Sequence, residues 1–344
     1  MEARTIRFVT RKWPPASGGM ETYSVRLTEE LAETRNVEVI ALPGRPTGEG
    51  PTAARMLGFG LRTALRLAFG PKADVVHVGD VAAWPLGLAA SLRHRRVILS
   101  GHGSDISYAT RPGPRGRLYA CYLRLGSSLL PKALLIANSG YIAKLASAYG
   151  FKRSTVVPLA SDYKDGPAPT RHNSAIFFAG RIARRKGLSH FVRHVLPLLP
   201  DHIRLRVAGP VWEQEEAQVL ACPRVDYVGI LPPEELQREY ASALCVIVPS
   251  LEPEGFGLVA AEAASAGGVV LAAAHSGLVE AVEAGGGILL DVHEPEQWAR
   301  KILHVLKWSA EERTRFTSTA MARGRSFFSW ERVARQTIEG YERA

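Results

Sequence analysis

The stretch that most constrains the fold runs from Leu244 to Ala264. Its first part, Leu244–Val248, has the length and apolar composition of a buried strand. Gly255 and Gly257 then frame a short loop, and the segment from Leu258 has the composition of a helix. A helix that starts at such a loop presents unpaired backbone N–H groups and a positive dipole end. The stretch therefore predicts a phosphate or diphosphate site at the start of this helix.

Two carboxylates flank this predicted anion site. Glu254 lies in the loop, and Glu262 lies about one turn into the helix. Acids beside an anion site are costly unless they have other partners, and an ionised carboxylate accepts well from two sugar hydroxyls at once. We therefore expect a ligand that carries both phosphate and sugar. The alternative is an ordinary strand–loop–helix unit whose acids are solvated.

Apolar strands and amphipathic helices alternate along the rest of the chain. This alternation is typical of α/β proteins with parallel sheets. The length of 344 residues is comfortable for two domains. The polar segment 159–174, with one glycine and two prolines, is the predicted linker between them.

Two loops in the first half follow predicted strands. Gly18 and Gly19 lie between a strand at 6–10 and a helix, where ligands bind in open α/β folds and where glycine lets a backbone approach a phosphate. His102 lies between two glycines after a strand at 96–100, which is a position suited to meeting a ligand. The alternatives are a plain loop and a histidine bonded to backbone.

A cationic loop follows the first predicted strand of the second half. Arg181 and Lys186 lie between Gly180 and Gly187. Arginine offers a planar fork of donors and lysine a point charge, so the loop has the composition of a phosphate clamp. The alternative is a solvated basic loop.

Several strings, in this order along nearly the whole chain, resemble the motifs of the GT4-type retaining glycosyltransferases. The strings are Gly18-Gly19-Met20-Glu21, His102-Gly103-Ser104-Asp105, Gly180-Arg181-Ile182 with Lys186-Gly187, and the E-x7-E pair Glu254 and Glu262. The segment Phe327–Ala334 is similar to the terminal segment of that family. The match is looser at Ser276–Glu280, where the family tends to have Gly-Gly-x-Pro-Glu.

The resemblance implies the GT-B fold, in which two Rossmann-like domains face each other across a cleft. It predicts an acceptor-binding domain at 1–160, a nucleotide-sugar-binding domain at 161–325 and a helix at 326–344 that returns to the first domain. The implied reaction is retaining transfer of a sugar from a nucleotide-diphosphate sugar to an acceptor hydroxyl, in cell-envelope glycan, polysaccharide or glycolipid assembly. No Asp-x-Asp string is present, so we expect neither a metal nor another cofactor.

The same resemblance implies roles for individual residues. The residues predicted for catalysis are His102, Arg181, Lys186 and Glu254. Those predicted to bind the donor nucleotide are Gly18, Gly19, Gly180, Phe256, Gly257, Leu258, Val259 and Glu262. Glu21 and Asp105 are predicted to bind the acceptor, and UDP or GDP is the expected nucleotide.

The net charge of +10 is unevenly placed. Residues 1–160 carry 22 Lys and Arg against 10 Asp and Glu, and the remainder is close to neutral. The basic half needs an anionic partner, such as nucleic acid, anionic lipid or a phosphorylated acceptor. Arg55–Phe69 and Arg111–Lys132 mix basic with apolar or aromatic residues, which suits a membrane interface. The alternative for Arg55–Phe69 is a helix that covers the sheet and leaves its arginines solvated.

The sequence lacks motifs that other classes of protein would need. A NAD-dependent dehydrogenase would need G-x-G-x-x-G after its first strand, and a GT-B epimerase would lack the E-x7-E string. A nucleic-acid-binding protein would explain the charge, but no known nucleic-acid motif is present. Three scattered cysteines and the absence of a signal-peptide layout predict a cytoplasmic protein, peripheral on the inner face of the membrane if it contacts lipid.

Overall fold

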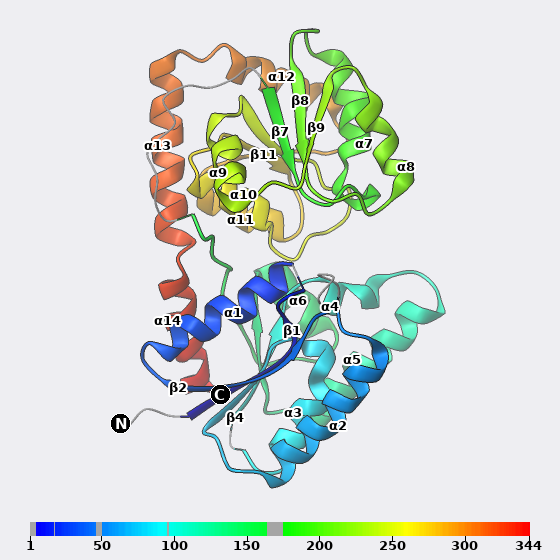
Figure 1. Cartoon of the computed structure of the whole chain (residues 1–344), viewed down its shortest axis with the longest axis vertical. Coiled ribbons are helices and arrows are strands. Elements are labelled where there is room, and N and C mark those ends of the chain that lie inside the picture. Colours follow the sequence, from blue (N-terminus) through cyan, green and yellow to red (C-terminus); the bar gives the residue numbers. More distant parts are fainter. Residues whose placement is uncertain (1–4, 17, 46–49, 95, 164–174) are drawn as a thin grey trace. The chain divides into compact units, whose positions relative to one another are not determined.

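The computed structural model describes residues 5–16, 18–45, 50–94, 96–163 and 175–344. The chain forms two compact units, which we describe separately: unit 1 comprises Met1–Leu159 with Trp330–Ala344, and unit 2 comprises Ala160–Ser329. Figure 1 colours them along the sequence, and the terminal red helix belongs to unit 1. Most of the predicted linker, residues 164–174, lies outside the described residues.

Unit 1 contains a parallel sheet of six strands in the order β2-β1-β3-β4-β5-β6. The strands are β1 Thr5–Trp13, β2 Asn36–Pro43, β3 Val75–Val78, β4 Arg96–Gly101, β5 Leu134–Ala137 and β6 Ser154–Val156. Strands β3 and β5 are buried along their whole length, as expected for a sheet covered on both faces. The strand order reverses beside β1, and such switch points hold the ligand crevice in open α/β sheets.

The helices of unit 1 cover both faces of this sheet. They are α1 Gly19–Ala32, α2 Ala53–Phe69, α3 Trp84–Ser91, α4 Ser104–Ser107, α5 Pro114–Leu129, α6 Gly140–Ala148 and α14 Trp330–Arg343. The terminal helix α14 lies against α1 and β5, and Arg332 donates to the carbonyl of Pro158 at 2.8 Å. Helix α3 contacts both α2 and α5. A 3-10 turn, Val81–Ala83, leads directly into α3.

Unit 2 contains a second parallel sheet of six strands, in the order β12-β11-β10-β7-β8-β9. The strands are β7 Ala175–Ala179, β8 Arg204–Ala208, β9 Val225–Gly229, β10 Cys245–Val248, β11 Val270–Ala273 and β12 Ile288–Leu290. Counted within the unit, this order is that of a classical dinucleotide-binding sheet. The predicted α/β class, with two Rossmann-like parallel sheets, is confirmed.

Helices surround the second sheet in the same way. The α-helices are α7 Leu188–His190, α8 Gln214–Ala217, α9 Pro233–Ser242, α10 Leu258–Ser265, α11 Gly277–Gly285, α12 Pro295–Leu306 and α13 Ala310–Phe327. Strands β7 and β10 are hydrogen-bonded neighbours. The loops that follow these two parallel strands therefore emerge at the same edge of the sheet. These are the two loops in which the sequence predicts the phosphate clamp and the E-x7-E motif.

Candidate active site

The loops after β7 and β10 are joined to each other in unit 2. The backbone N–H of Leu251 donates to the carbonyl of Arg185 at 2.9 Å. Gly187 has φ 75°, and a Cβ at this position would lie 1.9 Å from the carbonyl oxygen of Pro249. Only glycine permits both this backbone conformation and this close approach. Gly187 therefore lets the cationic loop lie directly on the acidic loop.

Lys186 and Glu254 meet where the two loops join. The Lys186 ammonium lies 2.7 Å from Glu254 Oε1, and the two side chains are only 13% and 11% exposed. The hydroxyl of Ser250 also bonds this carboxylate. Burial alone would raise the pKa of Glu254, but Lys186 and the Ser250 hydroxyl together hold it below its ordinary value. Glu254 is therefore a carboxylate at neutral pH, and it lies beside the Lys186 side chain.

A third loop, after β11, holds the acidic loop in place. The N–H of Glu254 donates to Ser276 Oγ at 2.9 Å, and the N–H of Gly277 donates to the Glu254 carbonyl at 3.0 Å. His275 Nε2 lies 2.7 Å from the carbonyl oxygen of Ser250. Ser276 has φ 58°, an uncommon conformation for a residue other than glycine. Sequence reasoning missed His275, Ser276 and Ser250, and the only signal was that the family motif is altered at Ser276.

The helix α10 begins at the predicted anion site. Its N-cap, Gly257, has φ 106°, and a Cβ there would lie 2.6 Å from Leu278 Cδ2. Phe256 is buried and packs edge-on against Phe328, with ring centroids 6.0 Å apart. Leu258 and Val259 are the first residues of the helix, and N–H groups there have no partner within a helix. These N–H groups are therefore candidates to bind the predicted anion, and that binding stays a prediction.

Glu262 lies on α10 in a less polar environment than Glu254. Its Oε2 accepts a hydrogen bond from the Tyr240 hydroxyl at 3.0 Å. Burial raises the pKa of Glu262 to about 7; the Tyr240 hydrogen bond opposes this rise, and the nearby Asp162 adds to it. Glu262 is therefore partly protonated at neutral pH, and a ligand that donates hydroxyls to it would favour its ionised form.

This raised pKa predicts a stability effect. An unfolded glutamate has a pKa near 4.3, so the native state binds more protons than the unfolded state up to about pH 7. Between these two pKa values Glu262 ionises in the unfolded state while it stays largely protonated in the native state. The free energy of unfolding therefore falls as the pH rises through this range. We expect Glu262→Gln to raise that free energy by about 2–3 kcal/mol at pH 8 and to leave it unchanged at pH 4.5. Urea unfolding at both pH values measures this, and equal effects at the two pH values would contradict the account.

The loop after β7 also contains Arg181, the second predicted clamp residue. Its guanidinium carbon lies 4.3 Å from the ring centroid of Trp212, which follows β8. Gly180 precedes it with φ 144°, and its N–H donates to the carbonyl of Ala208 at 2.9 Å. Sequence reasoning missed Trp212. Its signal was a tryptophan soon after the Gly209-Pro210 end of a strand, at the same edge of the sheet as the clamp.

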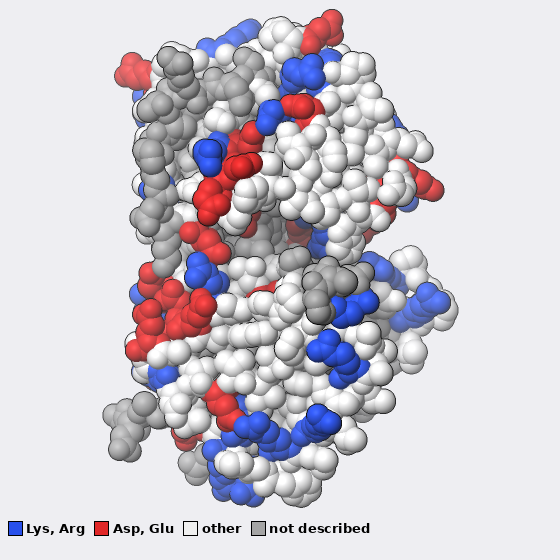
Figure 2. Space-filling view, viewed as in Figure 1, with Lys and Arg blue, Asp and Glu red and all other residues white. Residues whose placement is uncertain are grey.

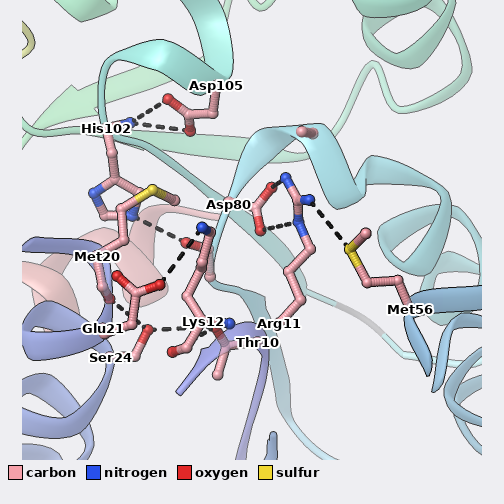
Figure 3. Close-up of polar contacts among 12 residues, drawn as sticks. Thr10, Arg11, Lys12, Met20, Glu21, Ser24, Met56, Asp80, His102 and Asp105 are labelled. Carbon is pink, nitrogen blue, oxygen red and sulfur yellow. Dashed lines mark hydrogen bonds and ion pairs between the residues drawn. The ribbon is translucent and has the colours of Figure 1, made fainter. Parts of the chain in front are cut away.

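In unit 1, His102 occupies the loop after β4. Its Nε2 lies 2.9 Å from the carbonyl oxygen of Gly79, and its ring packs edge-on against Tyr23 with centroids 4.5 Å apart. The carboxylate of Asp105 accepts from the backbone N–H of His102 at 3.0 and 3.1 Å (Figure 3), and from the backbone N–H of Gly103 at 2.7 Å. Asp105 is buried, and burial raises its pKa. It therefore fixes the His102 loop, and its contact with an acceptor stays a prediction.

The loop after β1 and the start of α1 place a second group of residues at this end of the sheet. Gly18 is the N-cap of α1, and Gly19 is its first residue. Glu21 is buried and lies 3.5 Å from the ammonium of Lys12. Arg11 binds the carboxylate of the buried Asp80 with two nitrogens, at 2.9 and 3.0 Å (Figure 3). Sequence reasoning did not single out Arg11, Lys12 or Asp80.

The predicted residues thus form two groups, one in each unit. Unit 2 contains Gly180, Arg181, Lys186, Glu254, Phe256, Gly257, Leu258, Val259 and Glu262, and unit 1 contains Gly18, Gly19, Glu21, His102 and Asp105. Among the residues that the structure describes, no cluster of three or more His, Cys, Asp or Glu could hold a metal ion. No described helix is long and apolar enough to cross a membrane.

Comparison with known families gives two matches that together span most of the chain. Residues 17–163 match the family described as Glycosyltransferase Family 4, and residues 164–323 match Glycosyl transferases group 1. The D-inositol 3-phosphate glycosyltransferase of Nocardioides sp. is 38% identical over 194 residues, which cover 50% of this chain and 42% of that protein. The chain therefore matches less than half the length of this relative.

Solved structures with the same fold cover the chain almost completely. The sucrose-phosphate synthase of Thermosynechococcus elongatus superposes over 99% of this chain and 98% of its own, with a TM-score of 0.77 and 20% identity. Anabaena Alr3699/HepE, in complex with UDP and glucose, superposes over 99% and 100%, with a TM-score of 0.76 and 20% identity. The chain belongs to the GT4-type glycosyltransferases and has the GT-B fold.

Proposed function

We propose that this chain transfers a sugar from a nucleotide-diphosphate sugar to an acceptor hydroxyl, with retention of the anomeric configuration. The observation that carries the proposal is the junction of the loops after β7 and β10. There a partly buried lysine meets a partly buried glutamate next to the start of α10. A cation and helix amides suit a diphosphate, and a carboxylate suits sugar hydroxyls. Unit 2 would hold the donor.

Each part of the donor then has a partner in unit 2. The diphosphate would bind Arg181, Lys186 and the amides of residues 256–259, since these groups favour negative charge. The transferred sugar would donate hydroxyls to Glu254, and the nucleotide ribose would donate to Glu262. Lys186 already bonds Glu254 at 2.7 Å. The Lys186 ammonium would therefore contact both the Glu254 carboxylate, which binds the sugar, and the diphosphate.

In the proposed reaction the bond between the anomeric carbon and the diphosphate oxygen breaks, and its electron pair stays on the diphosphate. The acceptor oxygen forms the new bond from the same face of the sugar, and the departing phosphate takes the proton of the acceptor hydroxyl. Arg181, Lys186 and the helix amides would stabilise the charge on the leaving group. We propose that this charge stabilisation needs no metal ion. Glu254 would orient the sugar, and His102 of unit 1 would meet the sugar at the transfer site.

The comparisons support a choice of substrates. The Anabaena neighbour was solved with UDP and glucose, which favours a UDP-sugar as donor, with GDP as the other expected nucleotide. The names of two relatives include inositol 3-phosphate and sucrose-phosphate. With the net positive charge of the first half, they favour an acceptor that carries phosphate, either a glycan or a lipid-linked sugar. We propose a role in envelope glycan, polysaccharide or glycolipid assembly.

A panel of UDP-, GDP- and ADP-sugars tests the proposed donor. Binding to the native state alone raises the melting temperature by mass action, so one nucleotide class should shift it, both with EDTA and with added Mn²⁺ or Mg²⁺. NMR of the product formed from the donor that binds then reports the anomeric configuration. A shift that depends on added metal would contradict metal independence, and no shift at millimolar concentration would count against the transferase.

We propose further that unit 1 contacts an anionic membrane surface, which would make the protein peripheral on the cytoplasmic face. Helix α2 exposes an apolar row at intervals of four residues, and these side chains are between 53% and 77% exposed. The row consists of Leu57, Leu61, Leu65 and Phe69. Helix α5 adds the exposed Leu118, Leu125 and Leu129. Of the two interpretations of Arg55–Phe69, these exposed leucines support the membrane interface over a helix that only covers the sheet.

Arginines lie among these apolar side chains. Arg62 on α2, and Arg115, Arg117 and Arg124 on α5, are exposed. Figure 2 shows blue Lys and Arg side chains, separated by uncharged surface, over the part of unit 1 that contains α2 and α5. Apolar side chains that enter the lipid and cations that meet anionic headgroups are the two terms that hold interfacial helices on membranes.

Co-sedimentation with vesicles tests this surface. We expect Leu61→Ser with Leu65→Ser to lower partitioning onto vesicles containing phosphatidylserine by about tenfold or more, since each exposed leucine contributes about 1 kcal/mol when buried in lipid. The matched control is Leu198→Ser, at an exposed leucine of unit 2. Neutral phosphatidylcholine vesicles should bind the wild type weakly. Equal binding of all three proteins to anionic vesicles would remove α2 from the contact.

A further inference from the structure

Trp212 is an exposed tryptophan at the edge of the sheet where the clamp loop lies. Its side chain is 64% exposed, although tryptophan is usually well buried. It lies in the loop after β8, and β8 is hydrogen-bonded to β7. The Arg181 guanidinium carbon is 4.3 Å from the centroid of its ring, within the range of a cation–π contact.

The backbone around Trp212 is fixed to the clamp loop at several points. The N–H of Trp212 donates to the carbonyl of Ile182 at 3.0 Å, and the N–H of Ile182 donates to the carbonyl of Pro210 at 2.9 Å. The N–H of Arg184 donates to the Glu213 carboxylate at 2.9 Å. A Cβ at Gly209 would lie 2.0 Å from the carbonyl oxygen of Gly180. The indole is therefore held against the loop that contains Arg181.

Stacking on a ring leaves the N–H donors of a guanidinium able to bind another group. A ring that stacks on an arginine contacts the flat face of the guanidinium, whereas the N–H groups of the guanidinium donate in its plane. One arginine can therefore stack on an indole and bind a phosphate through its edge at the same time. A flexible arginine loses side-chain entropy when it becomes ordered, and an arginine held against a ring has already lost part of it.

We propose that Trp212 is a positioning residue that holds Arg181 ready for the diphosphate of the donor. The inference rests on the proposed function, because it assigns Arg181 to that diphosphate. Trp212 acts through Arg181 and makes no contact with the nucleoside. The aromatic face, and not apolar bulk alone, is the property that matters.

Isothermal titration of the full chain with UDP and with uridine tests this role. Trp212→Leu keeps apolar bulk but removes the aromatic face, and Trp212→Phe keeps an aromatic face. We expect Trp212→Leu to weaken UDP binding about 2- to 30-fold, since cation–π contacts are worth about 0.5–2 kcal/mol. Trp212→Phe should lie close to the wild type, and uridine binding should not change.

The decisive arm combines the change with Arg181→Ala. If Trp212 acts through Arg181, Trp212→Leu has no further effect on UDP binding in the Arg181→Ala background. The same loss in both backgrounds, an equal loss of uridine binding, or no loss at all would overturn the proposal. If the wild type binds no nucleotide, the proposed function fails. The wild type, Trp212→Leu, Arg181→Ala and the double variant are then titrated with inorganic pyrophosphate. Weaker pyrophosphate binding by Trp212→Leu would then support the positioning role, and unchanged binding would overturn it.

Discussion

Replacing Lys186 with methionine will weaken binding of a UDP-sugar by about 2–4 kcal/mol, or roughly 30- to 1000-fold. The change removes the ammonium that bonds Glu254 at 2.7 Å and that we assign to the diphosphate. It also leaves the partly buried Glu254 carboxylate without the cation that lowers its pKa. Isothermal titration with UDP and a UDP-sugar measures the loss, and we expect both ligands to be affected alike.

The same substitution will lower the free energy of unfolding by about 1–3 kcal/mol at pH 7. A carboxylate with a lowered native pKa stabilises the fold above its unfolded pKa, and this contribution is lost as the pH falls. The deficit of Lys186→Met should therefore shrink below about pH 4.5. Adding Glu254→Gln should restore stability at pH 7 but not UDP binding. Arg185→Met, which changes the adjacent cation, is the matched control, and an equal loss there would contradict the specific role of Lys186.

Replacing Glu254 with glutamine will separate binding of the sugar from binding of the nucleotide. An amide has one acceptor oxygen where the carboxylate has two, and it has no charge to match sugar hydroxyls. We expect binding of the UDP-sugar to weaken about 10- to 100-fold, from the loss of about 1.4–3 kcal/mol of charged hydrogen bonds. Binding of UDP alone should stay equal or become tighter, because a negative charge near the diphosphate is removed.

Titrations of Glu254→Gln with UDP and with the UDP-sugar give the two affinities, and their ratio reports how much of the loss belongs to the sugar. Turnover should also fall about 10²-fold, because Glu254 orients the sugar and a small misplacement of a reacting group costs about that much. The neighbouring Glu252 lies in the same loop, so Glu252→Gln serves as the control. If Glu254→Gln weakened UDP as much as the UDP-sugar, Glu254 would belong to the nucleotide site and not to the sugar site.

Much of the fold was predictable because each strand ends in a recognisable loop. The run Leu244–Val248 predicts a buried strand, and β10 spans Cys245–Val248 with every residue buried. The loop with Gly180 and Gly187 follows β7, as the sequence indicates. The sequence was less reliable at helix ends: the terminal helix predicted at 326–344 begins only at Trp330.

The candidate site was predictable as a set of residues but not as a set of contacts. The sequence identified Lys186 and Glu254, which are 68 positions apart, in different roles. Their 2.7 Å ion pair depends on the pairing of β7 with β10, and on the close approach at Gly187. No local pattern encodes either. The sequence therefore predicted that both charged residues lie at the anion site, but not that they form an ion pair with each other.

The residues that sequence reasoning missed bond mainly through backbone or through a ring face. Ser276 binds the N–H of Glu254, and Trp212 stacks on Arg181. Neither role needs a particular spacing from its partner in the sequence. Arg11 and Asp80 likewise meet only because β1 and β3 are neighbours in the sheet. Contacts of this kind depend on the strand order of the sheet, and no single segment of the sequence predicts that order.

Hydrogen–deuterium exchange of the full chain, with and without a saturating UDP-sugar, tests the central claim most directly. Residues 180–187 form the clamp loop, and residues 254–260 form the end of the acidic loop and the first turn of α10; we assign both segments to the donor. The account predicts that both segments become protected together in the wild type, and that neither does in Lys186→Met at the same ligand concentration. Protection confined to unit 1, or unchanged exchange in both loops with the ligand bound, would show that the donor lies elsewhere.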